Sequence, residues 1–308
     1  MYNSDSDCEA GVDSRSPLII PETYNYVGVF LALHCNLRCS YCINRFGELD
    51  CSRPLLSGEA WVAGLNRIVS RGDLPITLQG GEPSLHPDFY EIINGIRPDL
   101  NIDLLTNLQF DVDEFMERVT PARIRREAPY ASIRVSYHPE SMDLDKLLFK
   151  VLKMVERGYS IGVWAVAHPQ AMVAIAEAGE KCSTLGIDFR TKEFLGGYQG
   201  KIYGSYKFAG AIGGRTGRRV ECRTSELLLG PHGDLYRCHS DLYGGRQSCG
   251  HLNAPDLQLS ECFQECDYFG DCNPCDVKIK TNRFQEFGHT SVEIRFAEQT
   301  EAGGASGV

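Results

Sequence analysis

The sequence predicts an α/β fold in which a parallel sheet is followed by a small cysteine-rich extension. Two patterns indicate this fold. Short apolar runs alternate with helical stretches over the first two thirds of the 308 residues, and seven of the 13 cysteines fall between positions 222 and 275. Alternating strands and helices joined by right-handed crossovers build parallel sheets. With 43% hydrophobic residues, the chain can form one large domain or about two ordinary ones.

Six apolar segments have the length and composition of buried strands. They are residues 26–33, 75–78, 102–106, 132–136, 161–166 and 187–190. The first connecting helix begins after Ser57, an N-cap residue, and carries apolar side chains at helical spacing: Trp61, Leu65, Ile68 and Val69. The later helices are predicted at 87–96, 112–119, 144–157 and 171–185, and Gly158 and Gly186 end the last two.

These segments make six strand–helix units or nearly so. In closed or partly closed barrels of this kind, active groups gather at the carboxyl ends of the strands. The polar motifs of this chain follow that rule, because a cysteine loop comes after the first strand and residues 79–83 come after the second. Thr106-Asn107 and Ser136-Tyr137-His138 end the third and fourth. A doubly wound sheet is the alternative fold.

The cysteine loop predicts an iron–sulfur cluster. Cys35, Cys39 and Cys42 have the spacing C-x-x-x-C-x-x-C, whereas a [4Fe–4S] cluster is normally held by four thiolates. Three local ligands therefore leave one iron open. A structural zinc site favours paired C-x-x-C hooks with a fourth ligand close by. Disulfides are disfavoured because residues 1–13 contain no apolar signal-peptide region, so we expect a cytoplasmic protein with free thiols.

This cysteine motif resembles that of the radical S-adenosylmethionine (SAM) superfamily. The resemblance implies a partial (β/α)6 TIM-like barrel in which the amino and carboxylate groups of SAM bind the open iron. An electron from the reduced cluster would cleave SAM, and the resulting 5′-deoxyadenosyl radical would take a hydrogen atom from the substrate. A low-potential electron donor such as flavodoxin or ferredoxin is implied as a partner.

Further residues match positions of that family. Residues 80–83 are its Gly-Gly-Glu-Pro motif, whose glycines permit close approach to a ligand and whose acidic side chain meets the SAM amino group. The resemblance implies the following cofactor-binding set: Tyr41 near the adenine, Gly80, Gly81, Glu82, Pro83, Asn107, Ser136 and Arg190. His138 at a strand end and Glu193 are candidate catalytic proton donors or acceptors. A satisfied loop histidine is an equal alternative for His138.

The C-terminal cysteines resemble the SPASM and twitch extensions of radical SAM enzymes. Cys222 is followed by Gly233-x-x-x-x-Cys238 within an expected hairpin of residues 227–229 and 235–238, and Cys262, Cys266, Cys272 and Cys275 close the set. The resemblance implies one auxiliary [4Fe–4S] cluster, held by Cys222, Cys238 and Cys275, with Cys272 or Cys266 as the fourth ligand. A zinc ribbon is the alternative for these cysteines.

The predicted organisation has five parts. They are a disordered tail at 1–21, a radical SAM core at 22–195, a Gly- and Tyr-rich linker at 196–220, a SPASM/twitch-like domain at 221–295 and a flexible tail at 296–308. The net charge of −10 argues against a nucleic-acid partner. No apolar run reaches the ~18 residues of a membrane-spanning helix.

The substrate is expected to be a carbohydrate-like or other polar metabolite. An auxiliary cluster can accept an electron from a substrate radical, which favours dehydrogenase-type oxidation. The alternative is modification of a ribosomally made peptide by epimerisation, crosslinking or oxidation. We expect no peptide-recognition domain before the barrel, since the first strand begins by Val27. A third class, a non-catalytic cluster carrier, does not need the SAM-binding motif at 80–83.

Overall fold

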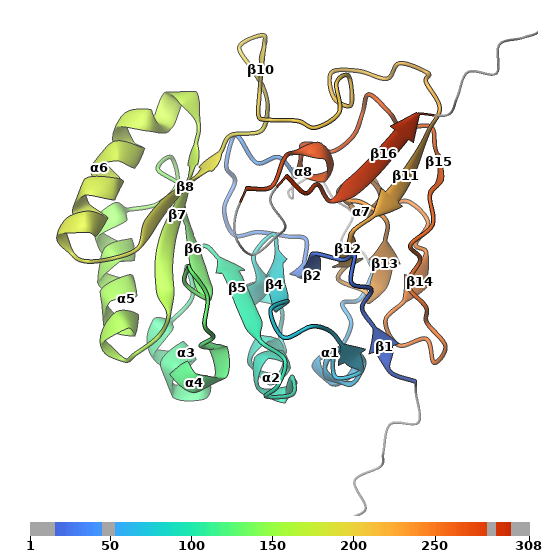
Figure 1. Cartoon of the computed structure of the whole chain (residues 1–308). Coiled ribbons are helices and arrows are strands. Elements are labelled where there is room, and N and C mark those ends of the chain that lie inside the picture. Colours follow the sequence, from blue (N-terminus) through green and yellow to red (C-terminus); the bar gives the residue numbers. More distant parts are fainter. Residues whose placement is uncertain (1–15, 45–52, 282–287, 297–308) are drawn as a thin grey trace, which may run out of the picture.

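A nine-stranded mixed sheet forms the centre of the protein (Figure 1). The structure is a computed structural model that describes residues 16–44, 53–281 and 288–296. The strand order is β14-β13-β12-β2-β4-β5-β6-β7-β8, and the six strands from β2 to β8 are parallel. Strands β14 and β8 are the two edges of this order, so the described strands form an open mixed sheet and not a closed barrel.

All six predicted strands are present in the predicted order. They are β2 (Tyr26–Ala32), β4 (Ile76–Gly80), β5 (Ile102–Thr106), β6 (Ile133–Tyr137), β7 (Ile161–Ala167) and β8 (Phe189–Glu193). The connecting helices are α1 (Gly58–Leu65), α2 (Phe89–Gly95), α3 (Val112–Arg118), α4 (Pro121–Ile124), α5 (Leu144–Glu156) and α6 (Met172–Thr184). Short 3₁₀ turns occupy Pro83–Leu85 and Pro169–Ala171.

Two predictions near the amino terminus need correction. The first helix ends at Leu65, and Ile68–Val69 forms strand β3 instead of a last helical turn. Strand β3 pairs in parallel with β1 (Leu18–Ile19), which lies within the predicted tail at 1–21. Leu18 is 1% exposed, so it is packed into the core and the segment around it is not a disordered tail. Residues 1–15 of the predicted tail lie outside the described part.

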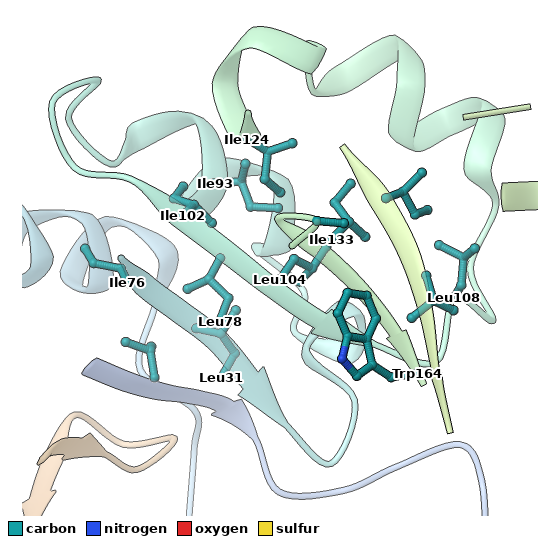
Figure 2. Packing of buried hydrophobic residues seen from close by; sticks show 14 of the residues in the cluster. Leu31, Ile76, Leu78, Ile93, Ile102, Leu104, Leu108, Ile124, Ile133 and Trp164 are labelled. Carbon is teal, nitrogen blue, oxygen red and sulfur yellow. The ribbon is translucent and has the colours of Figure 1, made fainter. Parts of the chain in front are cut away.

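The helices cover one face of the parallel strands, which is apolar. Figure 2 shows side chains from adjacent strands, among them Leu78, Leu104 and Ile133, packed with Ile93 of α2 and Ile124 of α4. Because side chains alternate across a strand, the register places a different set on the opposite face. We call this the inner face, and its polar members are Tyr26, Thr77, Gln79, Asp103, Arg134, Ser136, Arg190, Lys192 and Glu226.

The C-terminal third continues the main sheet and adds a second one. Its elements are β11 (Val220–Thr224), β12 (Glu226–Leu229), β13 (Asp234–Tyr236), α7 (His239–Tyr243), β14 (Gly250–His251), β15 (Gln264–Cys266), α8 (Pro274–Val277) and β16 (Val292–Phe296). The predicted hairpin is β12–β13, but β12 also pairs in parallel with β2. Strands β15, β11 and β16 form a separate sheet beside it (Figure 1).

The predicted linker at 196–220 also contains regular structure. Strands β9 (Gly196–Tyr198) and β10 (Lys201–Tyr203) form an antiparallel hairpin. This hairpin projects at the top of the view in Figure 1, beyond the carboxyl end of β8.

Candidate active site

The loop that follows β2 carries three free thiols. Cys35, Cys39 and Cys42 are each partly exposed, the Leu37 N–H donates to Cys35 Sγ at 3.4 Å, and the Cys42 N–H donates to the Cys39 carbonyl at 3.1 Å. Burial, with Glu140 and the two other thiols nearby, raises the pKa of Cys39 to about 12. Metal binding to such thiols therefore has to release their protons.

The described residues contain no group of three His, Cys, Asp or Glu side chains arranged to hold one metal ion. A [4Fe–4S] cluster does not require three side chains to meet at one metal ion, because each thiolate binds a different iron atom of the cluster. Three partly exposed thiols on one short loop fit the donor set of such a cluster with one iron left open.

The glycines of the 80–83 motif bring the end of β4 against the cysteine loop. The Gly81 N–H donates to the Ala32 carbonyl at 2.9 Å, and the Glu82 N–H donates to the His34 carbonyl at 3.0 Å. A Cβ atom at Gly81 would lie 2.1 Å from the His34 oxygen, and one at Gly80 would lie 2.0 Å from the Ala32 oxygen. Gly80 also has a φ of 148°, which disfavours any side chain. Glycine is therefore required here by close backbone approach.

Glu82 is a buried junction between strand ends. Its carboxylate accepts hydrogen bonds from Thr106 Oγ1, the Asn107 N–H and Ser84 Oγ, each at 2.7 Å. Only 1% of Glu82 is exposed, and burial raises the pKa of its carboxyl above the usual range. The geometry shows how Glu82 is held, while its predicted contact with the SAM amino group stays a prediction.

Asn107 connects this junction to the cysteine loop. Its Nδ2 donates to Asn36 Oδ1 at 2.7 Å and lies 3.8 Å from Cys35 Sγ. Asn107 is 4% exposed, so its side chain is fixed by packing as well as by hydrogen bonds. The structure thus brings Glu82, Asn107 and Cys35 together, as the sequence predicts for one carboxyl edge of a parallel sheet.

Tyr41 belongs to a cluster of rings at the same edge. Its hydroxyl is 3.0 Å from His138 Nδ1, and its ring stacks on His168 with a centroid separation of 5.0 Å. His168 in turn contacts Phe194 at 4.6 Å and Tyr198 at 4.7 Å between ring centroids. Tyr41 and His138, both predicted site residues, are therefore in contact.

Burial and the Lys192 charge lower the pKa of His138 to about 4. Its imidazole is thus neutral at pH 7 and can accept a proton or donate the hydrogen of one ring nitrogen. His168 was not among the predicted residues. The signal that identifies it is its place before Pro169 at the end of β7, which repeats that of His138 before Pro139 at the end of β6.

Glu140 is a second residue that the sequence prediction missed. Its carboxylate accepts the Ser40 N–H at 2.5 Å and the Ser40 hydroxyl at 2.8 Å. Ser40 lies between two of the cluster cysteines, so Glu140 ties the cysteine loop to the segment after β6. No motif in the sequence marks this contact.

Three other predicted residues lie outside this junction. Arg190 pairs with Asp188 at 3.0 Å and donates to the Pro129 carbonyl. Asp188 comes directly before β8, and Pro129 comes shortly before β6. The guanidinium of Arg190 therefore points toward the amino end of the sheet and not toward the cysteine loop. Glu193 is exposed and accepts a hydrogen bond from Ser205 Oγ at 2.9 Å. Ser136 lies on the inner face opposite Trp164.

Four C-terminal cysteines gather around a second apolar cluster. The Cys222 and Cys266 thiols are hydrogen-bonded, which raises the pKa of Cys222, and Cys238 and Cys272 raise it further. The same four side chains pack against an apolar group that includes Val220, Phe269 and Val277. Cys275 is not part of this group, and the charged side chains that act on it are Lys280, Asp276, Lys278 and Glu226; its predicted ligand role stays a prediction.

A buried histidine–aspartate pair joins this C-terminal region to the inner face. His239 follows Cys238, Asp276 follows Cys275, and Asp276 accepts hydrogen bonds from His239 Nδ1 and from the His239 N–H, each at 2.8 Å. These hydrogen bonds lower the pKa of Asp276. The His239 ring also contacts Phe30 of β2 at 6.0 Å between centroids.

Comparison with known proteins identifies the family. The model of the Radical SAM superfamily matches residues 29–188, more than half of the chain, from within β2 to the residue before β8. The chain belongs to the radical SAM superfamily. Membership implies a [4Fe–4S] cluster and SAM as cofactors of this radical SAM enzyme, which agrees with the prediction made from Cys35, Cys39 and Cys42.

Relatives of two activities match parts of the chain. A probable GTP 3′,8-cyclase of Methanocella arvoryzae is 31% identical over 148 residues, which are 45% of this chain and 44% of the relative. A PqqA peptide cyclase of Methylorubrum populi is 42% identical over 62 residues, or 20% and 16% of the two chains. This radical SAM chain thus spans less than half the length of the curated relatives it matches.

The fold is similar to that of a solved structure with bound AdoMet. The chain matches native anSMEcpe with bound AdoMet and the Kp18Cys peptide at a TM-score of 0.54 and 13% identity, covering 88% of this chain and 93% of the other. The match extends over most of the C-terminal third as well as the radical SAM core. Among the described residues, every helix is too short or too polar to cross a bilayer.

Proposed function

We propose that this protein is a radical SAM enzyme that acts on a ribosomally made peptide or protein. The observation that carries the SAM chemistry is the cysteine loop held against the 80–83 motif, with Asn107 between Cys35 and Glu82. The peptide substrate is supported by the PqqA peptide cyclase relatives and by the peptide bound to anSMEcpe. Neither comparison supports the carbohydrate-like metabolite that the sequence favours.

Cys35, Cys39 and Cys42 would hold the cluster. When bound, the cluster and SAM supply the electron and the radical that removes a substrate hydrogen atom. Glu140 and Asn107 hold the cysteine loop in place by hydrogen bonds to Ser40 and Asn36. The described contacts therefore fix the loop from two directions, which preorganises the ligands.

Residues at the carboxyl edge would orient and deprotonate the substrate. Neutral His138 can accept a proton. Its contact with Tyr41 fixes its ring at the carboxyl edge of the sheet. The rings of Phe194 and Tyr198 contact His168, so this edge carries apolar surface that would limit the access of water to the substrate.

A second candidate function is ring closure on a nucleotide. The GTP 3′,8-cyclase relatives match a longer stretch of the chain than the peptide cyclases do, and lysines on the inner face suit an anionic substrate. The relatives of both kinds are named as cyclases, so dehydrogenase-type oxidation has no support from their names.

We further propose that Cys222, Cys238, Cys266 and Cys272 hold an auxiliary [4Fe–4S] cluster. This set differs from the sequence prediction, which gives Cys275 a ligand role. Iron and zinc measured in a variant lacking the three loop cysteines test the assignment. About four irons retained per chain would support the auxiliary cluster, and zinc in place of iron would establish the zinc-ribbon alternative.

The test of the main proposal is anaerobic turnover. Protein reconstituted with iron and sulfide, reduced with dithionite or flavodoxin, should convert SAM to 5′-deoxyadenosine, and Cys35→Ala should abolish it. Candidate peptides, GTP and polar metabolites deuterated at carbon are then compared for deuterium transfer into 5′-deoxyadenosine. Transfer from a peptide supports the proposal, transfer from GTP favours the second candidate, and no 5′-deoxyadenosine refutes both.

A further inference from the structure

The inner face and the segment beside it carry two lysines, Lys192 and Lys278. Lys192 lies on β8 two residues after Arg190, which belongs to the inner face. Because side chains two residues apart on a strand share a face, Lys192 also points to the inner face. Lys278 lies nearby on the segment after α8, where it bridges to Tyr206. In the described part of the chain, neither ammonium group has a carboxylate within 4.0 Å.

Two carboxylates of this face, Asp103 and Glu226, already pair with cations. Asp103 is 0% exposed and binds both Arg126, at 2.6 Å, and Arg134, at 3.0 Å. Lys280 binds Glu226 at 3.3 Å. Glu193 acts on Lys278 electrostatically but its own hydrogen bond goes to Ser205. Two ammonium groups are therefore left without a bound counter-charge among the described side chains.

One further donor near Lys192 is buried without a partner. Arg134 is only 8% exposed, and its Nε has no hydrogen-bond partner in the described structure. Buried donors without acceptors are costly, and a ligand that brings several oxygen acceptors would remove this cost.

We propose that the inner face binds an oxyanion of the substrate, with Lys192 and Lys278 as its main contacts and Arg134 as a supporting donor. The proposal deepens the proposed function and rests on it: the oxyanion is the carboxylate of an acidic residue in the peptide. Phosphate has the same chemistry, so a nucleotide would use the same donors. Arg134 and Lys278 also repel the ammonium of Lys192, which together with burial lowers its pKa to about 7. An anion would relieve this repulsion.

Calorimetric titration of the reconstituted protein at low salt tests the proposal, with three probes. They are pyrophosphate, a capped Gly-Glu-Gly peptide and its Gly-Gln-Gly counterpart. The glutamate peptide should bind while the glutamine peptide does not. Lys192→Gln should weaken binding about tenfold or more, as loss of a charged hydrogen bond does, and Lys192→Arg should restore most of it. Lys181→Gln, on the outer surface of α6 where Lys181 pairs with Asp145, is the matched control and should not change it.

The outcomes separate this proposal from the proposed function. Binding of pyrophosphate alone would support the oxyanion site and assign it to a phosphate. Binding of neither anion, or equal binding by wild type and Lys192→Gln, would overturn the proposal. 5′-Deoxyadenosine formation by the same wild-type preparation is measured independently, so absence of SAM cleavage would refute the proposed function without deciding anion binding.

Discussion

Gly81→Ala should displace the cysteine loop. The new Cβ would lie 2.1 Å from the His34 oxygen, about 1.3 Å closer than ordinary contact at 3.4 Å. The next two atoms it would meet, at 2.5 and 2.7 Å, are also backbone atoms of residues 33 and 34. No flexible side chain can move aside, so the backbone between β2 and Cys35 has to shift.

The magnitude follows from two contributions. Overpacking of this kind costs roughly 1–3 kcal/mol. The shift would also strain the hydrogen bonds from Gly81 N–H to the Ala32 carbonyl and from Glu82 N–H to the His34 carbonyl, each worth about 0.5–1.5 kcal/mol net. The free energy of unfolding should therefore fall by roughly 2–6 kcal/mol, and the distorted loop should bind less iron.

Denaturant unfolding and iron content after reconstitution measure both effects. Gly72→Ala is the matched control, because a Cβ at Gly72 meets nothing within 4 Å. That variant should keep the stability and iron content of wild type. If Gly81→Ala unfolded at the wild-type denaturant midpoint and retained full iron, the close approach of β4 to the cysteine loop would be refuted.

Three other changes test separate contacts. Glu140→Ala removes the acceptor of Ser40, so an iron chelator should strip iron from the loop faster while the free energy of unfolding falls by only about 1 kcal/mol; an unchanged rate would contradict the anchoring role. Asp103→Asn leaves a buried guanidinium without its counter-charge and should lower the free energy of unfolding by roughly 3–5 kcal/mol; a loss below about 1 kcal/mol would contradict it. Burial lowers the pKa of His86 below its usual value of 6.5, so the folded state holds it neutral. Its contribution to stability is full above pH 6.5 and is lost as the pH falls through its folded pKa. The unfolding midpoint of wild type should drop more between pH 7.5 and 5.5 than that of His86→Gln, and equal drops would contradict the assignment.

The parallel core could be predicted because its signals are local. Strands β2, β4, β5, β6 and β7 are short and largely apolar runs, and glycines or capping residues mark most helix boundaries. Strand β3 could not be predicted in this way, since Ile68 and Val69 continue the helical spacing of Trp61 and Leu65. Its conformation depends on pairing with Leu18, some 50 residues earlier. Long-range partners of this kind leave no signal in a short window.

The site shows the same division. The cysteine loop, the 80–83 motif and Asn107 were predictable because each follows a strand and the carboxyl ends of parallel strands meet. Glu140 was not, because an exposed glutamate in a loop looks like any other surface residue. Arg190 was misplaced because its position near a strand end does not determine its direction, and Asp188 draws its guanidinium toward the opposite edge.

The auxiliary cysteines show why spacing alone does not determine a ligand set. Cys272 and Cys275 form a C-x-x-C hook, so spacing predicts that they bind together. The structure instead places Cys222 beside Cys266, because antiparallel pairing of β11 with β15 sets Cys222 opposite Gln264. Cys275 is the second residue of the short helix α8, whose Asp276 is held by His239, and Lys280 and Lys278 act on its thiol electrostatically. If Cys275 were nevertheless a cluster ligand, Cys275→Ser would lose auxiliary iron as fully as Cys266→Ser. The geometry predicts that only Cys266→Ser does so.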